Sequence, residues 1–191
     1  NWQIAQTVLK TAEQLGQAQR REESSSAFAD AAKRFESFFI DFPKSENRAE
    51  ALRLAAACFG KAGQTERSAD LFKEFIRLFP KNENAPIYMS QIAESYMSIL
   101  EFDKSLRYYE LLYKRTKNDP KHKDLKQAAL QNQPVLKVGI GDYVGAARGY
   151  EDYSKTLKGK EKEEAFYQAK HYWELSDTNW SKLEYYKRYR K

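Results

Sequence analysis

The strongest constraint on this chain is a recurring spacing: a small residue, an aromatic residue four positions later, and a large apolar residue three positions after that. Ser68, Phe72 and Phe75 show this spacing, which recurs 37 residues earlier and 37 residues later. Residues four and seven positions apart lie on one face of an α-helix. The pattern therefore predicts a helix that is repeated along the chain. The matching positions are Ala31, Phe35 and Phe38 in the earlier copy and Ser105, Tyr109 and Leu112 in the later copy.

A second helix is expected before each copy of this pattern. Apolar residues between positions 52 and 59 have helical spacing, and Gly63 and Gln64 form a short turn before the next helix. Pro43 and Pro80 stand at matching positions beyond the second helix, which they end because proline cannot continue a helix. Two helices per period of 34 to 40 residues, with a stop after each pair, are typical of a helical solenoid.

The order of small residue, aromatic residue and proline resembles the tetratricopeptide repeat (TPR). The endings Phe42-Pro43-Lys44-Ser45 and Phe79-Pro80-Lys81-Asn82 resemble the variant common in bacterial envelope proteins, such as outer-membrane assembly lipoproteins and periplasmic cell-division coordinators. The resemblance implies an all-α, right-handed α-solenoid of about five TPR-like helix-turn-helix pairs. We expect a single superhelical domain over residues 1–191, as a fragment of a longer protein, with pairs at about 1–43, 47–80, 85–118, 121–157 and 160–191.

Local features predict how individual helices begin and end. The run Ser24–Ser26 suits the N-cap of a helix that continues to Phe42, since serine favours that position. Pro134 predicts a kink or break near residues 132–134, because proline inside a helix costs about 3 kcal/mol. That distortion is either a tolerated irregularity or a place where a groove is reshaped for a ligand. The second helix of the fifth pair is expected to carry Trp180, Leu183, Tyr186 and Tyr189 on one face.

No group of residues predicts catalysis, a cofactor or a metal site. Cys58 lies in an alanine-rich helical stretch and is interpreted as a small core residue, because no histidine or cation is placed to lower its pKa. The two histidines, His122 and His171, fall in different pairs without a ligand-spaced partner. Gly139 and Gly141 are interpreted as a turn, because a dinucleotide loop needs a third glycine and a preceding strand. A non-enzymatic protein is therefore expected.

Charge is divided unequally along the chain, which has a net charge of +6. Residues 1–100 hold 13 basic and 13 acidic side chains, whereas residues 101–191 hold 20 and 14. The basic half is interpreted either as a solvated helical surface or as a site for an acidic protein, an anionic lipid surface or nucleic acid. Nucleic acid is the least favoured, because the aromatic residues between the cations at 185–191 keep helical spacing and packing explains them first.

The leading hypothesis is a scaffold that binds a partner protein or peptide on a concave groove, within a bacterial envelope complex. The periplasm or cell envelope is the expected location, with the cytoplasm as the alternative, and no stretch approaches the length of about 20 apolar residues of a membrane span. The alternatives are a helical accessory domain of a cell-wall enzyme and a nucleic-acid-binding repeat. The resemblance implies that the first helix of each pair lines the groove. The residues predicted there are Glu50, Arg53, Ala57, Lys61, Ile87, Ser90, Glu94, Met97, Gln131 and Val135.

Overall fold

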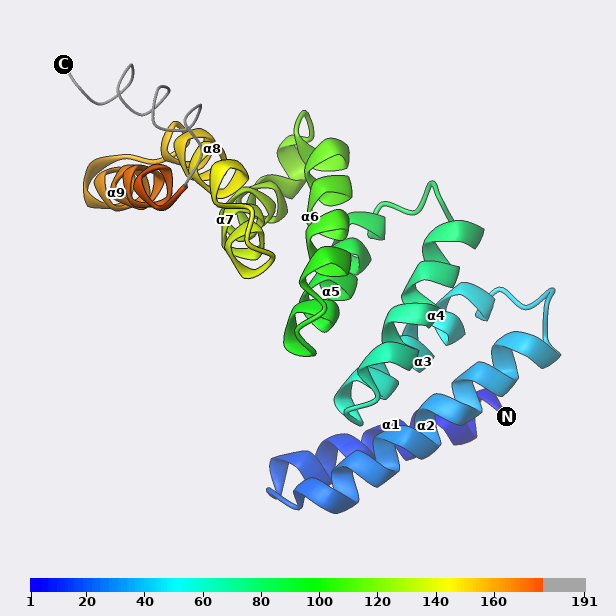
Figure 1. Cartoon of the computed structure of the whole chain (residues 1–191). Helices are drawn as coiled ribbons and strands as arrows, with labels where there is room; N and C mark the ends of the chain where they lie inside the picture. Colours follow the sequence, from blue (N-terminus) through cyan, green and yellow to red (C-terminus); the bar gives the residue numbers. More distant parts are fainter. Residues whose placement is uncertain (177–191) are drawn as a thin grey trace. The chain divides into compact units, whose positions relative to one another are not determined.

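The structure, a computed structural model, describes residues 1–176 of the 191. This part of the chain forms nine α-helices and one 3₁₀ helix and contains no strand (Figure 1). The predicted second helix of the fifth pair, with Trp180, Leu183, Tyr186 and Tyr189, lies outside the described residues. The elements are α1 (Trp2–Gln17), α2 (Arg21–Asp41), α3 (Arg48–Lys61), α4 (Thr65–Leu78), α5 (Ala85–Ser98), α6 (Phe102–Thr116), η1 (Pro120–His122), α7 (Lys123–Gly139), α8 (Tyr143–Ser154) and α9 (Gly159–Leu175).

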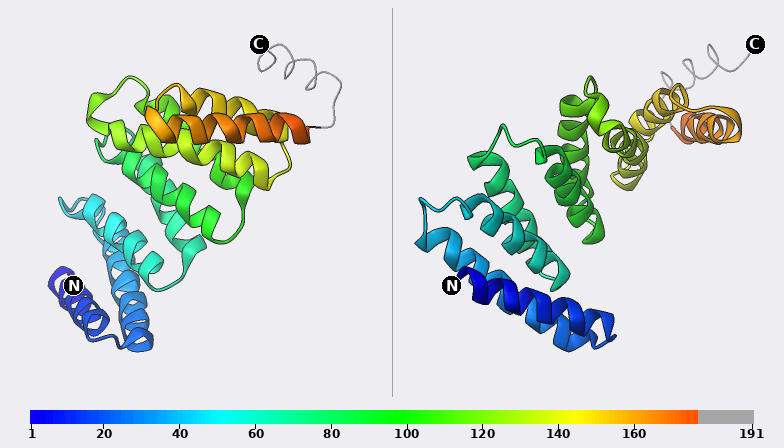
Figure 2. Two further views of the ribbon diagram at one scale, coloured as in Figure 1. Left: turned by 90° about the vertical axis from the view of Figure 1, so that its left-hand side faces the viewer. Right: turned by 180° about the vertical axis from the view of Figure 1, so that it is seen from behind.

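The helices belong to two compact units. The first unit comprises Asn1–Ile99, and the second begins at Leu100. Within the first unit each helix from α1 to α5 packs against the next, and within the second unit the same holds from α6 to α9. Figure 2 shows α7, α8 and α9 side by side. The predicted all-α fold class of stacked TPR-like helix pairs is confirmed, while a single domain over residues 1–191 stays a prediction.

Short turns of nearly constant geometry connect the helices within the pairs. The middle residue of each turn has a positive φ: 58° at Gln19, 76° at Gly63, 62° at Leu100 and 80° at Gly141. At three of these turns, the next residue donates its amide to the carbonyl five positions back, over 3.0, 2.9 and 2.8 Å. This bond satisfies a carbonyl that the helix end leaves open. The turns thus reverse the chain with little loss of backbone hydrogen bonding.

The loops after Pro43 and Pro80 also have matching conformations. The residue before each proline lies outside the helical region, with φ near −120° at Phe42 and −123° at Phe79. Each of these residues accepts a hydrogen bond at its carbonyl from the amide three positions later, over 3.1 and 3.0 Å. The predicted role of both prolines as helix stops is confirmed. In the next loop, Pro120 begins η1, which Asp119 caps by accepting a 2.9 Å bond from the Lys121 amide.

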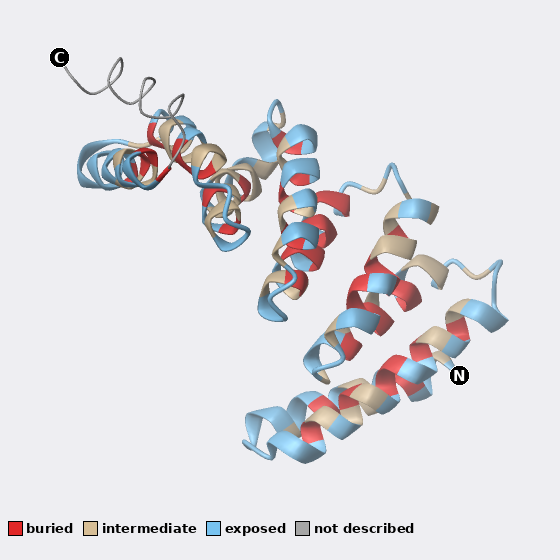
Figure 3. Cartoon of the chain, viewed as in Figure 1, coloured by how far each residue is buried: buried red, intermediate tan, exposed pale blue. Residues whose placement is uncertain are grey.

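The repeated small and aromatic positions form the core. Ala31, Phe35, Ser105 and Tyr109 are at most 1% exposed, and Phe72 is 3% exposed. Figure 3 shows buried segments alternating with exposed ones along α2. Burying one such ring contributes roughly 1.5 to 3 kcal/mol. The predicted register of the first three copies is therefore confirmed.

The three serines of α2 do not cap the helix as predicted. α2 begins at Arg21, directly after the turn, so Ser24 lies in the helix interior. Its hydroxyl donates to the Ala12 carbonyl over 2.8 Å, and a Cβ added at Gly16 would come within 3.1 Å of its oxygen. Ser25 donates to the Ala62 carbonyl over 3.1 Å. These small residues let α2 approach its neighbours closely, and this packing overrides the local preference of serine for a cap.

Of the predicted kink or break at Pro134, the break is wrong, because α7 runs unbroken from Lys123 to Gly139, while the kink stays a prediction. Pro134 is fully buried and lies against α8, where a Cβ added at Gly149 would come within 3.0 Å of the proline Cβ. The absence of a side chain at Gly149 allows this close approach. Packing between Pro134 and α8 offsets the hydrogen bond that the proline removes from the helix.

We expect Phe72→Ala to lower the free energy of unfolding by roughly 3 to 5 kcal/mol. The Phe72 ring on α4 stacks on Tyr88 of α5, with ring centroids 5.3 Å apart and planes at 12°, so its loss leaves a cavity between two helix pairs. Urea unfolding followed by circular dichroism measures the change. Ile40→Ala is the control, because Ile40 is 64% exposed and its truncation should change stability by less than about 0.5 kcal/mol. Equal stability of the two variants would contradict the repeat register.

The positive φ angles at the turns predict opposite changes in stability for two substitutions. Gly63→Ala should destabilise the chain by about 1 kcal/mol, because a side chain is strained at positive φ. No atom lies within 4 Å of the added Cβ, so the effect would come from the backbone alone. Leu100→Gly should stabilise by up to about 1 kcal/mol, since it removes the same strain at an exposed side chain. Thermal unfolding of both variants measures the two signs, and a stabilised Gly63→Ala would overturn this account.

Candidate partner-binding grooves

A groove of about 390 Å³ lies between α3, α4 and α5 in the first unit, and we name it the first groove. Its residues come from the C-terminal end of α3, the N-terminal half of α4 and the C-terminal half of α5. Small and hydroxyl-bearing side chains predominate, which keeps the groove open. The residues that line it are Ala57, Gly60, Lys61, Thr65, Ser68, Phe72, Gln91, Glu94, Ser95 and Ser98.

The charged groups of the first groove are one cation and one anion on facing helices. Lys61 extends from α3 and lies 3.8 Å from Glu13 of α1, with its ammonium 4.8 Å from the centre of the Phe28 ring. Glu94 extends from α5 and accepts a 2.8 Å hydrogen bond from the Ser90 hydroxyl. The lining side chains therefore have no net charge, and the first groove favours neither sign of ligand.

A second groove of about 580 Å³ lies between α7, α8 and α9 in the second unit, and we name it the second groove. It has the same construction as the first groove. In each groove the second helix of one pair (α4 or α8) lies between the first helix of its own pair (α3 or α7) and the first helix of the next pair (α5 or α9). Its chemistry differs, since it combines amide, phenol and carboxylate groups. The residues that line it are Gln127, Gln131, Val135, Tyr150, Tyr153, Leu157, Glu161, Glu164, Ala165 and Gln168.

Aromatic stacking holds in place Tyr150, one of the rings that line the second groove. The ring of Tyr150 stacks on Tyr172 of α9, with centroids 5.6 Å apart and planes at 7°. Tyr143 stacks on Tyr172 as well, with centroids 6.1 Å apart and planes at 7°. Burial, and to a smaller extent the neighbouring Tyr172, raise the pKa of Tyr150, so its phenol stays protonated at neutral pH. Such pairs add about 0.5 to 1.5 kcal/mol beyond area burial.

Half of the residues predicted for partner binding line these two grooves. The structure brings Ala57, Lys61 and Glu94 together in the first groove. It places Gln131 and Val135 in the second groove, with Val135 47% exposed. For these five residues, the structure agrees with the prediction that first helices line a groove. Their role in binding stays a prediction.

The other five predicted residues do not line either groove. Glu50 and Arg53 form a bidentate ion pair with N to O distances of 2.7 and 2.5 Å, and this hydrogen bonding raises the pKa of Arg53 against the opposing effect of burial. Ser90 is only 5% exposed and is occupied by its bond to Glu94. Ile87 is 38% exposed and Met97 is half-buried. None of the five is among the residues that line the two grooves.

Sequence reasoning missed the contribution of the second helices and of α9. Ser68 and Phe72 belong to the repeated core pattern, yet both also line the first groove. Tyr150 and Tyr153 occupy the same pattern in the fourth pair and line the second groove. Residue type gave no signal for this, because Phe72 lines a groove while Tyr109, at the same repeat position, is only 1% exposed and lines neither groove.

In the part of the chain that the structure describes, neither a metal-binding cluster nor a reactive thiol is found. Residues 1–176 contain no group of three or more His, Cys, Asp and Glu side chains that could hold a metal ion. His122 instead lies 2.8 Å from the Asp119 carboxylate, within the η1 loop. Cys58 is 1% exposed, which confirms its predicted place in the core. Burial raises the pKa of its thiol to about 11, so the reactive thiolate is scarce at neutral pH.

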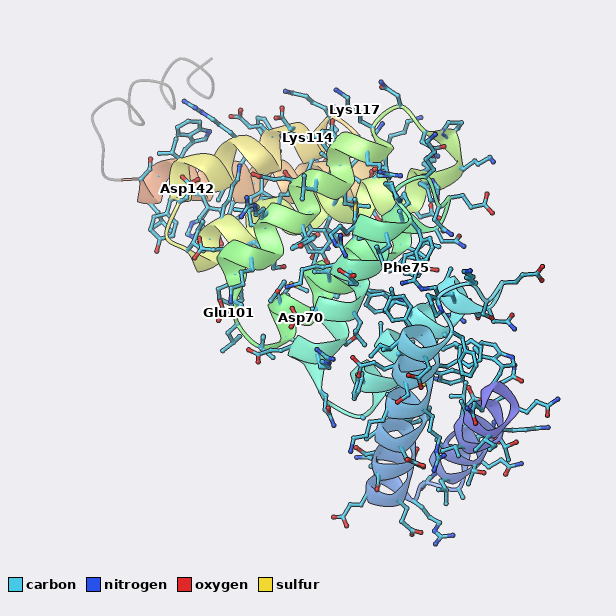
Figure 4. All side chains as sticks on the ribbon, turned by 90° about the vertical axis from the view of Figure 1, so that its right-hand side faces the viewer. Asp70, Phe75, Glu101, Lys114, Lys117 and Asp142 are labelled. Atoms are coloured by element: carbon cyan, nitrogen blue, oxygen red, sulfur yellow. The ribbon has the colours of Figure 1, made fainter. Side chains whose placement is uncertain are left out.

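The cations of the second unit include a group at the end of α6. Lys114 and Arg115 lie in the last turn, where the helix dipole favours positive charge, and Lys117 follows directly (Figure 4). Lys126 donates to the Lys117 carbonyl over 3.0 Å and so satisfies the helix end. Helix capping therefore accounts for these cations without a ligand. No helix within residues 1–176 has the length and apolar character needed to cross a membrane.

Known structures share this architecture, although the sequence matches no protein-family description and no curated protein. A putative kinesin light chain of Podosopora anserina with nearly identical TPR-like repeats is similar, with a TM-score of 0.62 and 11% sequence identity; the match covers 97% of this chain and 92% of that chain. BtubC (BKLC) from P. vanneervenii gives a TM-score of 0.54 at 12% identity, over 97% of this chain and 86% of the other. The chain thus has a TPR-like helical repeat fold.

We expect Cys58 to be unreactive in the folded protein. Its thiol should react with a thiol-specific reagent such as DTNB at least ~100 times more slowly at pH 7.5 than in guanidinium-unfolded protein, because burial limits both access and ionisation. Absorbance of the released thiolate measures the two rates. A folded-state rate close to the unfolded rate would show that Cys58 is accessible and would contradict its place in the core.

Proposed function

We propose that this chain is a non-enzymatic scaffold that binds a protein or peptide partner along the first and second grooves. The observation that supports the proposal is the repeated construction of the two grooves, each of which collects predicted first-helix residues between three consecutive helices. Helix-lined grooves of this kind can accept an extended segment or a helix of another protein. The similar structures carry TPR-like repeats as well, and they support the fold on which this proposal rests.

The lining chemistry agrees with protein binding better than with catalysis. The first groove offers hydroxyls at Thr65, Ser95 and Ser98, together with the Gln91 amide. Such groups can donate and accept hydrogen bonds, which suits the alternating carbonyl and amide groups of a polypeptide. No hydrogen bond joins a hydroxyl that lines the first groove to Lys61 or Glu94 in the described residues, whereas nucleophilic catalysis requires a nucleophile within hydrogen-bond reach of a base.

We also propose that the partner belongs to a bacterial envelope complex. The support is the resemblance of the Phe-Pro-Lys endings at Pro43 and Pro80 to envelope TPR proteins. Fractionation of the source cells into cytoplasm, membrane and periplasm, followed by immunoblotting against this chain, tests the location. Recovery in the cytoplasmic fraction alone would contradict it.

Site-specific photocrosslinking tests the binding proposal. A benzophenone amino acid at Gln91 in the first groove, or at Gln131 in the second, should crosslink to a discrete protein in an extract of the source cells. The matched control is the same substitution at Gln6, an exposed glutamine of α1 that lines neither groove. Mass spectrometry identifies the crosslinked species. Equal crosslinking from Gln6, or capture of nucleic acid alone, would contradict a groove-bound protein partner.

A further inference from the structure

The second groove is negatively charged within a unit of opposite net charge. Residues 100–176 hold 15 basic and 12 acidic side chains. The groove nevertheless contains Glu161 and Glu164 and no lysine or arginine among its lining residues. A cleft lined by one sign of charge concentrates ligands of the other sign. The sign at this groove therefore selects against the anionic ligands that the basic composition of the second unit suggested.

Both carboxylates are available to a ligand. Neither the Glu161 nor the Glu164 carboxylate forms a hydrogen bond or ion pair with any other residue in the described part of the chain. The two residues are three positions apart and face the groove together with Ala165 and Gln168, which continue the same face of α9. Glu161 lies in the first turn of α9, where the helix dipole favours an acid, but Glu164 lies one turn further along. The dipole alone therefore does not account for the pair.

The aromatic and aliphatic lining of the second groove suits long cationic side chains. Tyr150, Tyr153 and Leu157 line the groove together with the two carboxylates, and the Tyr150 ring is held by its stacking on Tyr172. A cation over a tyrosine ring is attracted by the ring's negative face. The aliphatic stem of lysine or arginine can pack on the same apolar surface while its charge reaches the groove edge.

Three glutamines supply the groups that an extended peptide backbone needs. The side-chain amides of Gln131 and Gln168 make no hydrogen bond with another described residue, and Gln127 uses one amide hydrogen to donate to the Thr156 hydroxyl over 3.2 Å. A glutamine amide has two donors and an acceptor. These side chains, on α7 and α9, can therefore bond carbonyl and amide groups of a peptide that lies between them.

We propose that the second groove binds an extended, lysine- or arginine-rich segment of a partner protein. This inference rests on the proposed scaffold function and adds the chemistry of the ligand. Glu161 and Glu164 pair with the cations, Tyr150 and Tyr153 contact their stems, and the glutamines bond the peptide backbone. The first groove, with one cation and one anion, does not share this preference.

Fluorescence anisotropy with two synthetic peptides tests the proposal. The probe is a fluorescein-labelled nonapeptide of alternating arginine and alanine, and the comparison peptide has glutamate in place of arginine. The full chain should bind the arginine peptide at least tenfold more tightly than the glutamate peptide. Glu161→Gln combined with Glu164→Gln should weaken binding of the arginine peptide about tenfold, because both ion pairs are lost.

Glu163→Gln is the matched control. Glu163 belongs to the same acidic run and is exposed, but it does not line the groove, so this change of one charge should alter the affinity less than twofold. Tyr153→Ala should weaken binding while Tyr153→Phe preserves it, since the ring and not the hydroxyl contacts the cation. Circular dichroism verifies that the glutamine variants retain the helical content of the parent chain.

Two results would overturn the inference. The first is an equal loss of affinity, per charge removed, in Glu163→Gln and in the double variant Glu161→Gln with Glu164→Gln. The arginine peptide would then be attracted by the whole charged surface and not by the second groove. The second is absent or equal binding of the two peptides. If that occurs while Gln91 in the first groove still crosslinks to a partner protein, the scaffold function stands and only the cationic ligand fails. If no groove position crosslinks, the scaffold proposal itself fails.

Discussion

Aromatic side chains of the second helices contact the first helix of the same pair or of the next pair. The stacking of consecutive pairs depends on these contacts. Phe35 and Phe38 of α2 pack against Trp2 of α1, within the same pair, at ring distances of 5.4 and 5.2 Å. Phe72 and Phe75 of α4 instead pack against Tyr88 of α5, in the following pair. Since α2 packs against both α1 and α3, and α4 against both α3 and α5, the apolar stripe of one helix is covered by two neighbours. Because a separate hairpin would leave part of such a stripe in water, packing against the next pair adds stability that one pair alone lacks.

The 37-residue spacing predicted the helices and most of their buried positions, but it concealed an insertion in α2. At their C-terminal ends α2 and α4 match at an offset of 37 residues, through Pro43 and Pro80. At their N-terminal ends they match at 44, because the Gly16 to Ser24 contact reappears as the Gly60 to Ser68 contact. The helices have 21 and 14 residues. Seven extra residues make about two full turns and rotate the face by only about 20°, so both alignments keep the same residues buried.

Local rules failed where the contact partner was distant in sequence. Serine at a helix start and proline within a helix each predict an interruption when only neighbours in the chain are considered. Ser24 and Pro134 are instead buried against the adjoining helix, where small size or close contact has the larger effect. The grooves follow the same logic. First-helix residues such as Ala57 and Gln131 could be predicted from periodicity, whereas Glu164 required the position of α9 against α8.

The two grooves show how one repeat position serves both folding and recognition. Phe72 and Tyr150 each follow a buried small residue by four positions, and each lines a groove. Phe72 is 3% exposed, whereas Tyr150 is half-buried. The apolar part of either ring maintains the packing between helices, but the phenol hydroxyl must keep a polar neighbour. At this repeat position the groove lining is a phenylalanine in one pair and a tyrosine in another, whereas Tyr109 at the matching position of the third pair is only 1% exposed. Ligand chemistry can in this way change from pair to pair while the stacking that produces the fold is preserved.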